Sequence, residues 1–196
     1  MSIVVNVISN RSSWIASDGL QRDSKTGKII RDDLHKFEIL NPHLCIGYTG
    51  CYEHVQQVVA KLKDLYQYIG KDIGKAFTDS AARYTKFLLD EAVRQIDGFD
   101  AQFVLTGTLS SRQIVSYIVK TGQPNQEFIC APGEFKYVIL NNRCVGNLGQ
   151  MIQRNGRGNV ITEDSILAGM RDLIRDTARY DKSVNTRISI HRIDIE

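Results

Sequence analysis

Apolar and polar residues are spaced in two different ways along the chain, and the two spacings predict its elements. A β-branched apolar run at 2–8 predicts a buried strand, and a polar turn followed by an apolar run at 14–17 completes a hairpin. Alternation at 36–40 and an apolar run at 44–48 predict two further strands. The charged segment 21–28 between these pairs predicts a loop or an exposed hairpin.

After residue 50 the apolar period changes to three and four residues, which is typical of amphipathic helices. This pattern predicts one helix over 55–69 and a second over 77–96. Thr162 precedes two acidic residues and is expected to be the N-cap of a third helix, whose apolar face extends to Thr177.

Further strands are predicted after the second helix and at the end of the chain. They cover residues 102–107, 114–119, 127–130 and 187–195, the last alternating strictly apart from one step at 191–192. Residues 134–140 fit either a helix or a strand, and 141–159 have no clear pattern.

The order of these elements predicts the fold class. Strands and helices are segregated along the chain, which favours an α+β fold with two antiparallel sheets covered by helix pairs. The sequence has no internal repeat or linker, so residues 1–196 are interpreted as a single domain.

Composition and charge exclude several classes of protein. The 196 residues are 42% hydrophobic and 24% charged, which excludes a disordered chain and a coiled-coil rod. The net charge of +3 is too small to indicate a nucleic-acid partner. Without a long apolar run or a signal-like N-terminus, we expect a cytoplasmic protein with no membrane partner. The cysteines and histidines lack the spacing of metal ligands, so no metal or cofactor is expected, and the cysteines are interpreted as free thiols.

Several motifs in this order resemble one known family. They are the N-terminal strand, a hairpin ending in Ala-Ser-Asp-Gly, the segment Lys-Phe-Glu-Ile-Leu-Asn-Pro-His-Leu, and Gly-Tyr-Thr-Gly before a helix. The chain resembles the proteasome β-subunit family of N-terminal nucleophile hydrolases, and most of all the bacterial homologues that pair with unfolding ATPases. The resemblance implies a four-layer αββα sandwich and threonine-type hydrolysis of peptides or unfolded proteins within a homo-oligomeric ring.

The resemblance also implies the site residues. The family nucleophile corresponds to Ser2, exposed when Met1 is removed, and the aspartate sixteen residues later corresponds to Asp18. Lys36, five residues before Asn41, matches the family lysine, and Gly50 matches the glycine whose N–H stabilises the oxyanion.

Other positions match less closely. Asp181 and Ser183 correspond to a family Asp and Ser, with one residue fewer between them. Tyr48 falls at a position that lines the pocket for the residue before the scissile bond, where a bulky ring should favour small or modest side chains. The family turn whose serine supports the nucleophile's amine is matched to 131–133, where Pro132 has no hydroxyl.

These residue types suit hydrolysis by a terminal serine. A free amine with a pKa of roughly 7.7–8.0 can accept the hydroxyl proton, and a nearby ammonium favours its neutral form. Three functions remain open: a serine-type peptidase, a catalytically inactive structural or assembly protein of the same fold, and an amidase acting on a small amide.

Overall fold

The computed structural model describes residues 2–23, 26–69, 77–109, 113–141, 143–156 and 160–195. Met1 lies outside this part of the chain. The elements, in order, are β1 (Val4–Ser9), β2 (Ser12–Asp18), β3 (Gln21–Arg22), β4 (Ile29–Arg31), β5 (Phe37–Asn41), β6 (Leu44–Gly50), α1 (Tyr52–Ile69), α2 (Phe77–Gln95), β7 (Ala101–Thr108), β8 (Ile114–Lys120), β9 (Gln126–Ile129), β10 (Phe135–Leu140), α3 (Leu148–Asn155), α4 (Glu163–Tyr180) and β11 (Ile188–Asp194).

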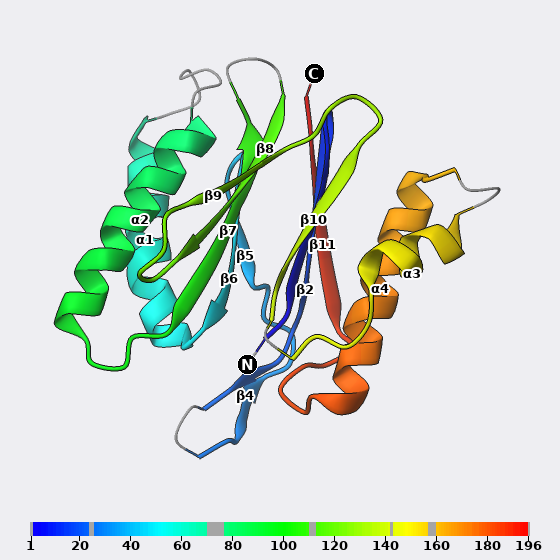
Figure 1. Cartoon of the computed structure of the whole chain (residues 1–196). Helices are drawn as coiled ribbons and strands as arrows, with labels where there is room; N and C mark the ends of the chain where they lie inside the picture. The colour runs from blue at the N-terminus through cyan, green and yellow to red at the C-terminus, as the bar shows by residue number, and fades with distance from the viewer. Residues whose placement is uncertain are drawn as a thin grey trace.

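Two antiparallel sheets form the centre of the molecule. One has the order β10-β1-β2-β11 and the other β5-β6-β7-β8-β9, while β3 and β4 form a separate hairpin. Helices α1 and α2 cover the outer face of the five-stranded sheet, and α3 and α4 cover the outer face of the four-stranded sheet (Figure 1). The expected α+β class and the αββα layers are therefore confirmed.

Three hydrophobic cores hold these layers together. One lies between α1, α2 and the five-stranded sheet, with Phe103 fully buried in it. A second lies between the two sheets around Ile15 and Val104, and a third under α3 and α4 around Ile3 and Leu173. Because both faces of β1 and β2 are covered, every residue of these strands is buried. This explains why β1 has a continuous apolar run rather than an alternating pattern.

β11 carries apolar residues on both faces, which explains the step in its alternation. Ile190 packs with the helix-side core and Ile193 with the core between the sheets. Between them Arg192 lies over the ring of Trp14, 5.6 Å from its centroid, and pairs with Glu163 at the start of α4. The apolar side of the strand therefore changes at the position where the sequence pattern breaks.

Two segments that the sequence left open are now assigned. Residues 135–140 form β10, an edge strand paired with β1. Residues 148–155 form α3, whose N-cap Asn147 accepts a hydrogen bond from the backbone N–H of Gln150. The buried residues Leu148, Met151 and Ile152 have helical spacing, so the cap and the period together were a usable signal.

Two further expectations concern membrane-spanning helices and the state of the cysteines. In the described part of the chain, no helix is both long and apolar enough to cross a bilayer. All four cysteines are free thiols, with Cys45 and Cys130 buried and Cys51 and Cys144 half-buried.

Candidate functional site

A buried ion pair lies next to the start of β1. Lys36 Nζ is 2.6 Å from Asp18 Oδ1, and the two side chains are 3% and 0% exposed. The same Oδ1 accepts a hydrogen bond from the backbone N–H of Ile3 at 3.0 Å. Asp18 therefore links the peptide group that follows Ser2 to the lysine ammonium within two hydrogen-bond lengths.

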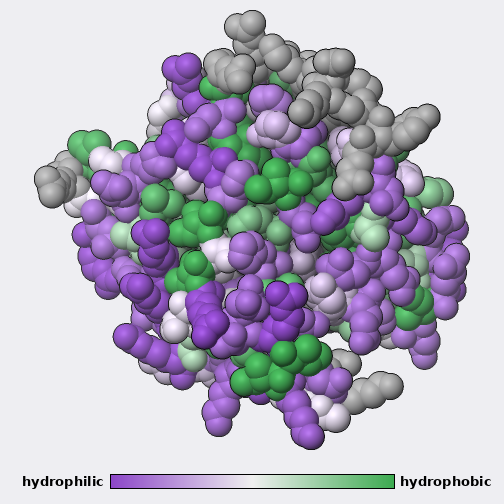
Figure 2. Space-filling view, turned by 180° about the vertical axis from the view of Figure 1, so that it is seen from behind, coloured by the Kyte–Doolittle hydropathy of each residue, from purple (hydrophilic) through white to green (hydrophobic). Residues whose placement is uncertain are grey.

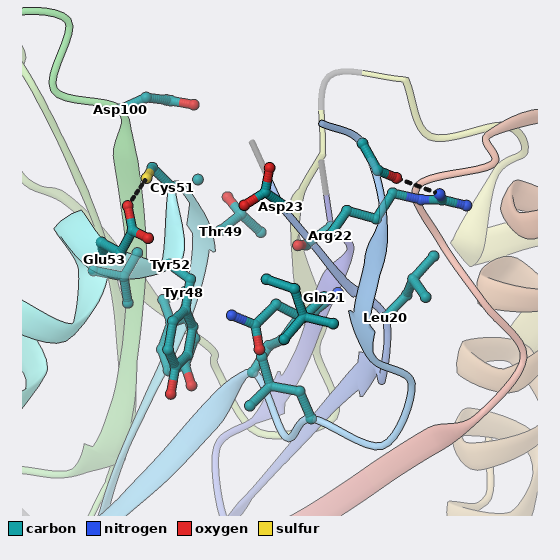
Figure 3. A pocket seen from close by; sticks show the side chains of 17 residues that line it. Leu20, Gln21, Arg22, Asp23, Tyr48, Thr49, Cys51, Tyr52, Glu53 and Asp100 are labelled. Atoms are coloured by element: carbon teal, nitrogen blue, oxygen red, sulfur yellow. Dashed lines mark hydrogen bonds between the residues drawn. The ribbon is translucent and has the colours of Figure 1, made fainter. Parts of the chain in front are cut away.

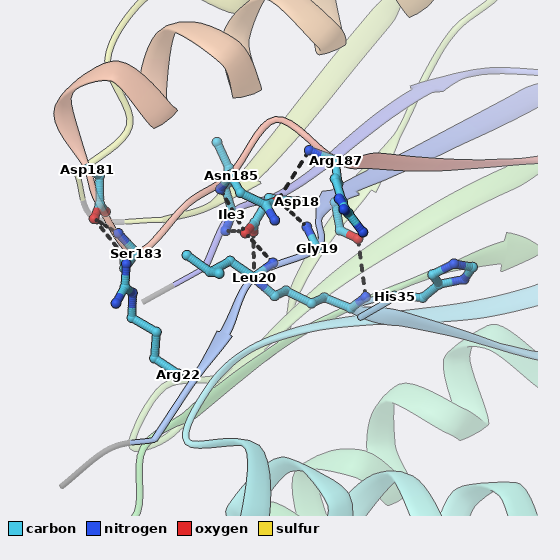
Figure 4. Close-up of polar contacts among 12 residues, drawn as sticks. Ile3, Asp18, Gly19, Leu20, Arg22, His35, Asp181, Ser183, Asn185 and Arg187 are labelled. Atoms are coloured by element: carbon cyan, nitrogen blue, oxygen red, sulfur yellow. Dashed lines mark hydrogen bonds and ion pairs between the residues drawn. The ribbon is translucent and has the colours of Figure 1, made fainter. Parts of the chain in front are cut away.

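The local fold fixes this pair in place. The register of β1 with β2 pairs Val4 with Ser17, which puts Asp18 beside the N-terminal end of β1. Lys36 is held by its backbone N–H, which donates to Ser17 Oγ at 3.1 Å. The second carboxylate oxygen of Asp18 accepts from the N–H of Leu20 at 3.0 Å (Figure 4). The aspartate is therefore oriented by several donors.

Burial and the neighbouring charges shift the pKa of Lys36 in opposite directions. Burial lowers the pKa of Lys36 below its ordinary value, and the Asp18 carboxylate only partly offsets this effect through its charge and hydrogen bond. The Asp181 carboxylate raises the same pKa to a smaller extent. Lys36 is thus a desolvated cation whose charge depends on two nearby carboxylates.

A cavity of about 390 Å³ opens beside the pair. Its lining includes Ser2, Lys36, Gly50 and Tyr48. Figure 3 shows Tyr48 and Tyr52 side by side on one wall and the side chains of β3 opposite them. The fold therefore brings the predicted nucleophile, lysine, glycine and pocket residue to one cavity, from the chain start, the residue before β5, and β6.

Gly50 has a backbone conformation that only glycine adopts easily. Its φ is +121°, and a Cβ placed there would lie 2.4 Å from the carbonyl oxygen of Asp100. Another residue would therefore displace the end of β6, and with it the backbone that lines the cavity.

Tyr48 is 3% exposed, and its hydroxyl donates to the carbonyl of His35 at 2.9 Å. Burial is the main cause that raises the pKa of this hydroxyl, so it stays protonated. The ring is thus fixed at the wall of the cavity.

Asp181 and Ser183 lie close to each other on the loop after α4, but they are not among the residues that line the cavity. Asp181 Oδ1 accepts from the Ser183 hydroxyl at 2.6 Å and from the Ser183 N–H at 2.9 Å. Burial would raise the pKa of Asp181, but these bonds and the nearby positive charge of Arg143 lower it overall. Asp181 Oδ2 is buried with no hydrogen-bond partner among the residues described here.

Sequence reasoning missed Asn185, which ties this loop to the ion pair. Its backbone N–H donates to Asp18 Oδ2 at 3.4 Å, and its side-chain oxygen accepts from the N–H of Gly19 at 2.8 Å (Figure 4). Its amide nitrogen donates to the carbonyl of Asp32. These partners are more than 150 residues away along the chain, so no local pattern could have indicated them.

The match of residues 131–133 to the amine-supporting turn is wrong. This turn precedes Phe135, which pairs with Ser9 at the far end of β1, whereas Leu140 pairs with Val4 next to Ser2. Five residues of strand separate the two ends, roughly 17 Å. The segment that follows Leu140 lies on the Ser2 side instead, so Pro132 has no bearing on the site.

The described residues contain no group of three or more His, Cys, Asp or Glu side chains that could hold a metal ion. The arrangement of Ser2, Lys36, Asp18 and Gly50 is suited to nucleophilic and electrostatic chemistry by the chain's own groups.

The comparisons with known proteins support the fold. No family model and no curated protein matches the sequence. Among solved structures, the chain is similar to Anbu, the ancestral beta-subunit, from Yersinia bercovieri, with a TM-score of 0.76 and 14% identity over 98% of this chain and 81% of that one. It is also similar to a Gly-1 mutant of Anbu from Hyphomicrobium sp. strain MC1, with a TM-score of 0.72 and 15% identity over 100% and 84%.

These findings correct the assignment made from the motifs. The chain was assigned to the proteasome β-subunit family, most of all to the bacterial homologues that pair with unfolding ATPases. No family model supports that assignment, and the two solved structures named above are Anbu proteins. At this level of identity the likeness shows a shared fold and no more. Short motifs at matching spacing were enough to indicate the fold but not the family.

Proposed function

We propose that the protein is a peptidase whose nucleophile is the hydroxyl of Ser2, exposed as the N-terminal residue when Met1 is removed. The observation that carries this proposal is the shared oxygen of Asp18, which binds both the N–H of Ile3 and the ammonium of Lys36. This arrangement keeps a desolvated cation beside the nucleophile at a cavity large enough for a side chain.

The mechanism follows from the position of these groups. The Ser2 amine accepts the hydroxyl proton as the hydroxyl oxygen attacks the scissile carbonyl. The Lys36 ammonium lowers the pKa of that amine by like-charge repulsion, and Asp18 keeps the ammonium oriented. The N–H of Gly50 stabilises the oxyanion, an effect commonly worth about 10²–10³ in rate. The protonated amine then gives its proton to the leaving nitrogen as the C–N bond breaks, which leaves the acyl group on the Ser2 oxygen as an ester. Water, deprotonated by the same amine, cleaves this ester, and the serine hydroxyl regains its proton.

Asp181 has a supporting role in this proposal. Its Oδ1 is occupied by Ser183, and its buried Oδ2 has no partner among the described residues. An acceptor of this kind on the Ser2 side of the sheet can bind the amine of a processed chain and orient it. Ser183 fixes the carboxylate for this purpose.

The test compares two substitutions at the nucleophile in protein made without an N-terminal tag. Alanine, serine and threonine are all small second residues, so Met1 should be removed from all three proteins. Intact mass verifies this removal first. Ser2→Thr should retain peptidase activity on fluorogenic peptides, because it keeps the hydroxyl. Ser2→Ala should lose at least about 10³-fold with an unchanged melting temperature.

Three results would reject the proposal. Retained Met1 would leave Ser2 without a free amine, and the protein would then be a structural or assembly protein of this fold. Full activity of Ser2→Ala in processed protein would locate the reaction elsewhere. Hydrolysis of small amides but not of peptides would favour the amidase alternative.

A further inference from the structure

Arg22 donates several hydrogen bonds although its side chain is exposed. Its Nε and Nη2 donate to the carbonyl of Lys182 at 3.2 and 2.8 Å, and its Nη1 donates to the carbonyl of Gly27 at 2.9 Å. Three donors of one planar guanidinium are thus used on two backbone carbonyls. Figure 4 shows the side chain reaching from β3 to the loop that carries Asp181 and Ser183.

One of these carbonyls belongs to the wall of the cavity. β3 and β4 pair with each other rather than with either main sheet, and Gln21, Arg22, Gly27 and Ile30 all line the cavity. A two-stranded hairpin is marginal by itself in water. Its position over the cavity therefore depends on attachments to the body of the protein, and Arg22 provides one.

The other carbonyl belongs to the turn of the site. Lys182 lies between Asp181 and Ser183, whose mutual hydrogen bonds orient the Asp181 carboxylate. The N–H of Val184 closes the turn by donating to the carbonyl of Asp181 at 3.0 Å. A contact at the Lys182 carbonyl thus restrains the turn at its centre.

We propose that Arg22 is a positioning residue, which clamps the β3–β4 hairpin to the Asp181–Ser183 turn and so holds the cavity wall and the Asp181 carboxylate in one arrangement. This inference rests on the proposed peptidase function. Geometry rather than charge is its basis: a lysine keeps the charge but cannot donate to both carbonyls with the same rigid fork.

The experiment uses processed full-length protein and three variants: Arg22→Ala, Arg22→Lys and Arg154→Ala. Arg154 is the matched control, because its exposed side chain also joins two elements, α3 and α4, through Asp172 at 3.2 Å, away from the cavity. We expect kcat on a fluorogenic peptide to fall about tenfold in both Arg22 variants, with a smaller change in KM. Hydrogen exchange should become faster in residues 181–185 of both, and Arg154→Ala should resemble the wild type in both measurements.

Each other outcome has a definite meaning. If Arg22→Lys keeps full kcat, charge rather than the clamp is what matters, and the inference is wrong. Unchanged hydrogen exchange in Arg22→Ala would equally overturn it. A wild-type protein that is processed yet inactive would remove the proposed function and this role with it, whereas an active wild type with an equally active Arg22→Ala would remove this role alone.

Discussion

At the scale of single residues, the buried Asp18–Lys36 pair should matter for stability as well as for the proposed function. A buried ion whose partner is removed is strongly destabilising, typically by about 3–5 kcal/mol. Asp18→Asn should therefore lower the free energy of unfolding by about that amount, since Lys36 and the N–H groups of Ile3 and Leu20 all use the carboxylate. Urea denaturation measures this change.

A second ion pair provides the comparison. Asp79 and Arg83 pair on the surface of α2, with side chains 39% and 70% exposed. Asp79→Asn should cost no more than about 1 kcal/mol. Equal losses in the two variants would mean that the buried pair contributes little.

Tyr48 should control which side chain precedes the cleaved bond. Its buried ring is fixed by the hydrogen bond to His35. The ring therefore forms a rigid wall of the cavity and limits the space for a substrate side chain. Tyr48→Ala should extend cleavage toward larger side chains in a fluorogenic peptide panel, whereas Tyr48→Phe, which keeps the ring, should not. An unchanged preference in Tyr48→Ala would exclude this residue from the substrate pocket.

At the scale of elements, the edge strand β11 should make stability depend on pH. Burial lowers the pKa of His191, whose ring lies 6.3 Å from that of Phe37 on β5. The unfolded chain therefore binds this proton at a higher pH than the folded one. The contribution of the neutral, buried His191 ring to the free energy of unfolding is complete above about pH 6.5. It is lost as the pH falls from there to the folded-state pKa.

His191→Gln should remove this part of the pH dependence. Urea denaturation at several pH values would show a shallower fall in the free energy of unfolding below pH 6.5 in the variant than in the wild type. The loss of the ring contact adds an offset that does not vary with pH. Parallel curves would mean that His191 does not titrate differently on folding.

At the scale of the whole molecule, we expect a closed homo-oligomer. The β4 residues Ile29 and Ile30 are 57% and 55% exposed. Figure 2 shows an apolar patch at the lower edge of the molecule. Ile30 also lines the cavity, so a neighbouring copy at this hairpin would complete its wall. Sedimentation at tens of micromolar should show one closed species, and Ile29→Asp with Ile30→Asp should weaken it. A monomeric wild type would contradict this expectation.

Helices and strands whose apolar residues have a clear period could be predicted from the sequence. The apolar run of β1, the helical periods of α1, α2 and α4, and the Thr162 cap each depend on neighbouring residues, and the structure confirms them. The spacing of Asp18 and Lys36 was informative because Asp18 ends β2 and Lys36 directly precedes β5, both near the chain start. The 131–133 match failed because a loop of similar composition says nothing about which end of a strand it follows.

The sequence by itself determined the layers, because burial on one or both faces of an element is recorded in the period of its own apolar residues. Only the tertiary structure decided which loops meet at the cavity. The contacts from Arg22 to Lys182 and from Asn185 to Asp18 join residues at least 160 positions apart. They use polar groups and backbone carbonyls that any loop could offer, so their partners are chosen by how the two sheets stack and not by local pattern.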